Sequence, residues 1–199
     1  MKENQKIRPV LERIREQEIT WEGASMADGR KSKIWCIGIA TASTLSLLIK
    51  LHSPKVIVEL GTSSGLSALV MAQAATTKAK IYTIEADPQK VVMAKQNFSD
   101  ADQEDTISLI SGDIGDAIRK NLLPESIDFL FIDADKKNYS LYYSLLKDKL
   151  VRGSIIVADN VLSHEKELTE FIASMFEDPM LNTVIWPHEA GLLVSKVVA

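Results

Sequence analysis

The sequence predicts an α/β fold with a mostly parallel sheet, and three observations support this prediction. From about residue 54 onward, short apolar or β-branched runs alternate with segments of helical periodicity. This β-α-β-α order favours a parallel sheet covered by helices on both faces. Most of these apolar runs also end abruptly in acidic, amide or glycine residues, as buried parallel strands do where their carboxyl ends open into a site.

The expected elements follow one another along the chain with short connections. The first expected helix covers about residues 3–19. A turn-rich stretch follows at 21–33, which we expect to be a connector rather than a mobile flap, and the next helix is expected at 41–51. The expected strands are 56–60, 80–84, 106–110, 127–132 and 154–158, followed by 182–186 and 192–197 as an antiparallel pair. The helices between them are expected at 67–75, 88–97, 114–121, 139–150 and 165–176.

Composition indicates one soluble domain. The chain has 199 residues, of which 46% are hydrophobic and 25% charged, and no linker divides it. We therefore expect a single domain, with a helical or flap extension at 1–34 and a core at 35–199. The net charge of −4 argues against a broad nucleic-acid footprint. A single cysteine, a polar N-terminus and no long apolar run favour a cytoplasmic protein without a membrane span.

Two successive apolar runs end in candidate metal ligands. One ends in Asp133, with Lys136 three residues later, and the next ends in Asp159 and Asn160. Alone, such residues are usually solvated loop charges or turn residues. Because the carboxyl ends of parallel strands share one edge of a sheet, we expect these oxygens and this amine to lie together, as a divalent cation and a base require. Lys137 is a rival to Lys136 for the amine.

A glycine loop indicates a nucleoside site. Gly61 and Gly65 follow the first strand and open a helix, but Ser63 stands where the dinucleotide fingerprint has a second glycine. Glu85 ends the next strand, where a carboxylate can accept hydrogen bonds from the ribose hydroxyls. Asp113, at the following strand end, is a candidate for framing the adenine. Loop and acid together favour nucleoside binding over a plain strand–helix turn.

These motifs resemble the cation-dependent O-methyltransferases, a family that includes catechol and caffeoyl-CoA O-methyltransferases and small bacterial members. The likeness rests on E-L-G-T-S-S-G at 59–65, on Glu85, on I-D-A-D-K at 132–136 and on A-D-N at 158–160, and it covers about residues 35–199. It implies a Rossmann-like methyltransferase fold with seven strands, S-adenosylmethionine as methyl donor, and Mg²⁺ or a similar divalent cation. The family habit, with the amphipathic N-terminal segment, also favours a homodimer.

The resemblance implies roles for individual residues. The implied methyl-donor site consists of Ile37, Glu59, Gly61, Thr62, Ser63, Gly65, Ser67, Glu85, Asp113 and Asp133. The implied metal ligands are Asp133, Asp159 and Asn160, and the implied catalytic base is Lys136. Asp135 is expected to have neither role.

The chemistry of O-methylation agrees with this residue set. A divalent cation bound to a vicinal diol lowers the pKa of the acceptor hydroxyl and fixes its orientation, and a nearby lysine can take up the proton. Two carboxylates and an amide suit octahedral Mg²⁺, whereas the lack of His or Cys ligands makes zinc unsuitable. We therefore expect methyl transfer to a small catechol-like or hydroxylated aromatic acceptor.

Three segments depart from the family pattern. Residues 161–164 run almost directly into a helix where relatives carry an added loop, and residues 187–192 replace a frequent G-D-G-L turn. Residues 38–43 lack the glutamine that commonly begins the following helix. His164 and His188 could line the acceptor pocket, although both are expected to be ordinary loop histidines.

The same residues give less support to three other functions. A relative that methylates a hydroxylated tRNA base would need a basic rim, for which Arg30, Lys31, Lys33, Lys136 and Lys137 are few. A non-catalytic S-adenosylmethionine sensor would have no use for the acidic and lysine residues. A nicotinamide dehydrogenase is disfavoured by the incomplete glycine fingerprint.

Overall fold

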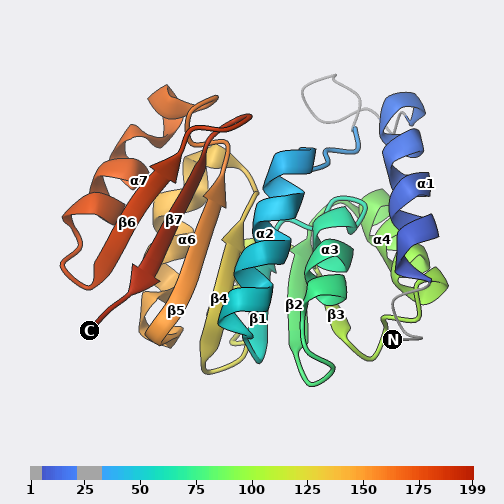
Figure 1. Cartoon of the computed structure of the whole chain (residues 1–199), viewed down its shortest axis with the longest axis horizontal. Helices are drawn as coiled ribbons and strands as arrows, with labels where there is room; N and C mark the ends of the chain where they lie inside the picture. Colours follow the sequence, from blue (N-terminus) through green and yellow to red (C-terminus); the bar gives the residue numbers. More distant parts are fainter. Residues whose placement is uncertain (1–5, 22–32) are drawn as a thin grey trace.

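The computed structural model describes residues 6–21 and 33–199, which form a three-layer α/β structure around one seven-stranded sheet (Figure 1). The strands are β1 (Val56–Leu60), β2 (Lys80–Glu85), β3 (Ile107–Ser111), β4 (Ile127–Ile132), β5 (Leu150–Asp159), β6 (Leu181–Trp186) and β7 (Leu192–Val197). Their order is β3-β2-β1-β4-β5-β7-β6. β7 is antiparallel to β5 and β6, and the other pairs are parallel. The predicted Rossmann-like sheet with an antiparallel C-terminal pair is confirmed.

Helices cover both faces of the sheet (Figure 1). On one face lie α1 (Ile7–Thr20), α2 (Ile39–His52), α3 (Leu66–Ala74) and α4 (Pro88–Asp100), and on the other α5 (Ile114–Arg119), α6 (Tyr139–Leu146) and α7 (Glu165–Glu177). Side chains alternate between the faces along each strand. Phe129 and Phe131 join the core beneath α1–α4, whereas Leu130 and Ile132 join the other core. No helix in the described part of the chain is long and apolar enough to cross a membrane.

The strand order places the candidate motifs at one crevice. From β1 the chain moves outward through β2 to β3, and it then returns to β4 beside β1 before moving outward to β5 in the opposite direction. Ligands of such sheets bind at this change of direction, beyond the carboxyl ends of the strands. The glycine loop after β1 and the acidic residues after β4 and β5 therefore meet there.

The predicted helix at 139–150 and the predicted strand at 154–158 need correction. α6 ends at Leu146, and after a 3₁₀ turn Leu150 already begins β5. Leu150 pairs with the start of β4, but the register then shifts. At this irregularity Gly153 takes a left-handed φ of 96°. The residues in the first half of β5 therefore do not form the apolar run by which a strand is recognised in a sequence.

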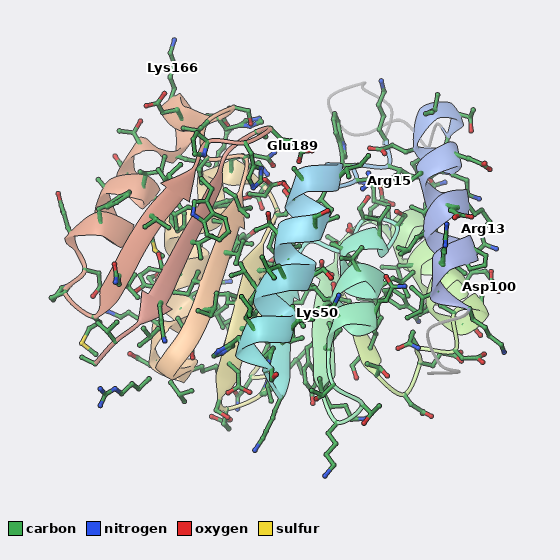
Figure 2. The ribbon with its side chains drawn as sticks, in the orientation of Figure 1. Arg13, Arg15, Lys50, Asp100, Lys166 and Glu189 are labelled. Atoms are coloured by element: carbon green, nitrogen blue, oxygen red, sulfur yellow. The ribbon has the colours of Figure 1, made fainter. Side chains whose placement is uncertain are left out.

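α1 buries its apolar face within the chain. Ile7, Val10 and Ile14 are buried, and the helix packs on α3 and α4. Arg13 adds an ion pair, with its Nη2 2.6 Å from the Asp100 Oδ2 of α4 (Figure 2). The prediction of a homodimer rests in part on this amphipathic segment. Its buried apolar residues, however, are already covered by the chain itself.

Glu59 is a fully buried carboxyl group in the centre of the sheet. Its Oε2 accepts a 2.6 Å hydrogen bond from the Thr83 hydroxyl on β2, and its Oε1 has no partner among the described residues. Burial raises the pKa of Glu59 to about 8, although polar contacts with Ser67 and Thr83 act in the opposite direction. The folded chain therefore favours the protonated, neutral form of Glu59 near neutral pH.

We expect Glu59 to make the protein less stable as pH rises. Its pKa is about 8 in the folded chain and 4.5 for an unperturbed carboxyl. The folded state therefore holds an extra proton between these values, and the free energy of unfolding falls by up to about 1.4 kcal/mol per pH unit. Glu59→Gln is neutral at every pH, so its stability should depend less on pH.

Urea unfolding from about pH 5 to about pH 8 would measure this difference, with the exposed Glu104 changed to Gln as the control. The same pH slope in wild type and Glu59→Gln would show that Glu59 does not hold the extra proton.

Candidate active site

A cavity of about 520 Å³ lies beyond the carboxyl ends of the central strands. Its walls come from the loops after these strands and from residues 35–37, which precede α2. The predicted site residues that line it are Ile37, Gly61, Thr62, Ser63, Ser67, Glu85, Asp113, Asp133, Lys136, Asp159 and Asn160. Glu59 and Gly65 are not among the lining residues. The structure thus gathers most of the predicted donor and metal residues around one space.

The glycine loop is shaped by close contacts that exclude side chains. Gly61 has a φ of 96°, and a Cβ there would collide with the main-chain oxygen of Asp133. Gly65 has a φ of 88°, and a Cβ there would meet the ring of Phe98 on α4. Glycine is therefore required at both positions for conformation and for space. Gly61 brings the loop against the end of β4, and Gly65 seats the start of α3 on α4.

Two carboxylates at the next strand ends are fixed by main-chain amides. Glu85 accepts hydrogen bonds from the backbone N–H groups of Ser63, at 2.8 Å, and Asp87, at 2.9 Å. Asp113 caps α5 by accepting a 2.9 Å hydrogen bond from the backbone of Asp116. Glu85 is thus held in contact with the glycine loop, and both carboxylates line the cavity.

The candidate metal ligands bring two carboxylates together. Asp159 is only 4% exposed, and its Oδ1 has no hydrogen-bond partner in the described part of the chain. Burial, with repulsion from Asp133, raises the pKa of Asp159 to about 6. Asn160 follows with a left-handed φ of 67°. Within residues 6–21 and 33–199 no three His, Cys, Asp or Glu side chains form a metal cluster. The predicted ligand set of two acids and one amide is a different kind of group.

Lys136 lies in the cavity wall and is held by three oxygens. Its Nζ donates to Asp133 Oδ1 at 2.9 Å, to the carbonyl of Ala134 at 3.0 Å and to Tyr139 Oη at 2.9 Å. Lys137 is exposed and does not line the cavity. The geometry therefore favours Lys136 over its neighbour as the amine of the site.

The segment before α2 closes one side of the cavity. The backbone N–H of Trp35 donates a 3.1 Å hydrogen bond to Ser63 Oγ of the glycine loop. The next N–H, of Cys36, donates a 3.0 Å bond to Glu18 Oε1 of α1. Both residues and Ile37 line the cavity. Since the segment is held by the loop and by α1, its position depends on elements far away in the sequence.

The structure adds residues that the sequence interpretation missed. Tyr139 is buried beneath Lys136, and its hydroxyl donates a 3.3 Å hydrogen bond to the carbonyl of Asp159. Tyr142 lines the cavity and donates a 2.6 Å bond to Asp135. His164 was expected to be an ordinary loop histidine, but it also lines the cavity. The three-residue spacing from Lys136 to Tyr139 was the available signal, because it places both on one side of a helical turn.

Comparisons with known proteins place the chain in a family. A family model described as O-methyltransferase matches residues 10–182. The flavonoid 3',5'-methyltransferase of Vitis vinifera is 32% identical over 165 residues, which cover 75% of this chain and 70% of that protein. The catechol O-methyltransferase of Niastella koreensis is 36% identical over 129 residues, covering 63% and 58%. The chain thus spans less than two thirds of the length of this second relative.

Solved structures show the same fold. An O-methyltransferase from Bacillus cereus in complex with SAH has a TM-score of 0.79 at 20% identity, covering 96% of this chain and 90% of that one. An O-methyltransferase from Streptomyces achromogenes in complex with SAM has a TM-score of 0.78 at 17% identity, covering 98% and 90%. The family match spans the glycine loop and both acidic strand ends. The chain therefore belongs to the O-methyltransferase family, as its motifs predicted.

Proposed function

We propose that this chain transfers the methyl group of S-adenosylmethionine to a hydroxyl group of a small catechol-like or hydroxylated aromatic molecule, with Mg²⁺ or a similar divalent cation at the site. One observation carries most of the proposal. One cavity is lined both by the glycine loop and Glu85 and by Asp133, Lys136, Asp159 and Asn160. Relatives named catechol and caffeoyl-CoA O-methyltransferase support the acceptor class.

The donor end would be bound by main-chain groups and one carboxylate. Among residues 6–21 and 33–199, each oxygen of Glu85 accepts one hydrogen bond, from Ser63 or from Asp87, so each retains a lone pair for a ribose hydroxyl. The backbone of Gly61 can approach a ligand closely because no side chain intervenes. Ile37, which also lines the cavity, would lie against the methionine end.

The acidic end fits a hard divalent cation. Asp133, Asp159 and Asn160 supply oxygen donors of the kind that Mg²⁺ prefers. The unpartnered Oδ1 of Asp159 supports this assignment, because a buried carboxylate oxygen without a partner is costly unless a cation or donor satisfies it. When bound, such a cation lowers the pKa of a coordinated acceptor hydroxyl and fixes its orientation.

Lys136 is placed to receive the proton of the acceptor hydroxyl. Its contacts with Asp133, Ala134 and Tyr139 hold Nζ at the cavity wall, beside the candidate metal ligands. In its neutral form Nζ would take the proton while the acceptor oxygen bonds to the methyl carbon. The carbon–sulfur bond breaks with its electron pair going to sulfur, which leaves S-adenosylhomocysteine.

The alternatives differ in what they require of the same cavity. Methylation of a tRNA base would need a basic rim around the cavity. Of the five basic residues considered, Arg30 and Lys31 lie outside the described residues, and Lys136 lines the cavity itself. Only Lys33 and Lys137 of this set are described as exposed. A non-catalytic donor sensor would not explain the contacts of Lys136. The homodimer and the cytoplasmic location stay predictions.

Methyl transfer should depend on a divalent cation. We expect EDTA to abolish transfer from labelled S-adenosylmethionine to a catechol, and Mg²⁺ to restore it. Asp159→Asn removes one of two carboxylates, so it should weaken the apparent Mg²⁺ affinity roughly tenfold or more. SAH binding, measured by calorimetry, should persist in this variant.

The exposed Asp148, changed to Asn, serves as the matched control. A transfer rate that is indifferent to EDTA would contradict the metal assignment.

Lys136→Met should lower kcat by about 10²- to 10⁴-fold, since it removes the proton acceptor. Affinity for SAH should stay within about twofold, because Lys136 is proposed to act on the acceptor. Lys137→Met changes the exposed neighbour in the same way and should be close to wild type in single-turnover assays. Equal losses in the two variants would mean that Lys136 is not the base.

A further inference from the structure

The turn between β6 and β7, residues 187–191, contacts α2 through the side chains of His188 and Glu189. His188 Nε2 lies 3.4 Å from Thr44 Oγ1, and Glu189 makes the shorter contacts, with the first turn of the helix. Glu189 Oε1 accepts a 2.9 Å hydrogen bond from the backbone of Ala40. Its Oε2 accepts 3.1 Å bonds from the backbone and the hydroxyl of Thr41. Figure 2 shows Glu189 at the end of this hairpin, beside the first turn of α2. The contact joins residues 148 and 149 positions apart in the sequence.

These two amides are the ones that a helix normally caps locally. Ala40 and Thr41 are the second and third residues of α2, whose N-cap is Gly38 and makes no side-chain cap hydrogen bond. A Ser, Thr, Asp or Asn at the N-cap would usually accept a bond from one of them. Glu189 replaces such a cap from another element, and its negative charge is favourable at a helix N-terminus.

Glu189 is ionised in this position. Partial burial raises its pKa, but hydrogen bonds from Ala40 and Thr41 outweigh that effect and hold the pKa below its ordinary value. Glu189 also has a left-handed φ of 48°, a conformation that costs a residue with a side chain more than glycine. A side chain at a position that suits glycine is consistent with a role for its carboxylate.

The capped helix end continues directly into a wall of the cavity. Trp35, Cys36 and Ile37 line the cavity immediately before Gly38. The glycine loop and α1 fix the first part of this segment through backbone bonds from Trp35 and Cys36. Its other end leads into α2, so the position of Ile37 depends on how firmly the first turn of that helix is held.

Two departures from the family pattern meet in this contact. The segment at 38–43 lacks the usual glutamine, and the turn at 187–192 replaces the frequent G-D-G-L sequence. The structure places Glu189, from the second segment, on the free amides of the first. The two segments singled out in the sequence are therefore in direct contact.

We propose that Glu189 is a positioning residue for the methyl-donor site, because it caps α2 and thereby fixes the wall at 35–37. This inference rests on the proposed function, since it concerns the binding of the same donor. Glu189 is not among the residues that line the cavity, and its hydrogen bonds lead to the first turn of α2. Its charge also contributes to raising the pKa of Asp159.

Two single variants should weaken donor binding through the same contact. Glu189→Ala removes the cap. Gly38→Ala places a Cβ where the Glu189 carboxylate lies, and its φ of −63° is suitable for alanine. From the usual effect of losing a helix cap, each should raise the Kd for SAH about 3- to 10-fold in calorimetry. Backbone amides at 40 and 41 should also exchange hydrogen faster.

The double variant and a conservative variant distinguish this role from a general loss of stability. Gly38→Ala combined with Glu189→Ala should bind SAH no more weakly than either alone, because both remove one contact. Glu189→Gln keeps an oxygen acceptor and should recover part of the affinity. Glu170→Ala, which removes an exposed carboxylate from α7, is the control and should bind SAH as wild type does.

The possible results separate this inference from the proposed function. If Glu189→Ala lowers the melting temperature but leaves the SAH Kd unchanged where both proteins are folded, Glu189 is only structural and the inference is wrong. Additive losses in the double variant would also overturn it. A wild-type chain that binds no SAH would instead overturn the proposed function.

Discussion

The contact between Gly61 and the main chain of Asp133 joins the two halves of the site. β1 and β4 are neighbours at the centre of the sheet, and the N–H of Asp133 donates a 3.0 Å hydrogen bond to the carbonyl of Leu60. Any residue larger than glycine at position 61 would push the loop away from the carbonyl of Asp133. Because this approach is possible, the glycine loop and Asp133 line one cavity.

The same convergence concentrates negative charge in a partly buried space. Asp133, Asp159 and Glu85 all line the cavity, and Glu59 lies behind it. The structure relieves this charge in different ways. Lys136 pairs with Asp133, main-chain amides hold Glu85, and Glu59 favours its neutral form. Asp159 Oδ1 has no hydrogen-bond partner among the described residues, and the proposed cation site rests on this observation.

Much of this arrangement could be predicted from the sequence, because parallel strands place their carboxyl ends at one edge. That rule predicts from the sequence alone that Glu85, Asp133, Asp159 and Asn160 lie together, and all four line the cavity. The family resemblance then implied the methyl donor and the role of Lys136 as the base, which stays a prediction. The first half of β5 was missed because a glycine and polar residues interrupt its apolar pattern.

Contacts made between distant residues could not be predicted in this way. The cap on α2 joins residues nearly 150 positions apart, and only the folded hairpin brings Glu189 to that helix. His164 is similar, since a short loop gives no indication of which side chain turns toward a cavity. The contact of Tyr139 with Lys136 is local, but its hydrogen bond to the carbonyl of Asp159 depends on β5 lying beside β4.

The central claim is that methyl donor and cation occupy neighbouring positions in one cavity. Carbon NMR of methyl-labelled S-adenosylmethionine, bound to the protein and titrated with paramagnetic Mn²⁺, tests it most directly. The account predicts strong, saturable relaxation of the methyl carbon, which Mg²⁺ reverses by competition and which Asp159→Asn largely removes. A methyl signal that is unaffected by Mn²⁺ while the donor stays bound would contradict it.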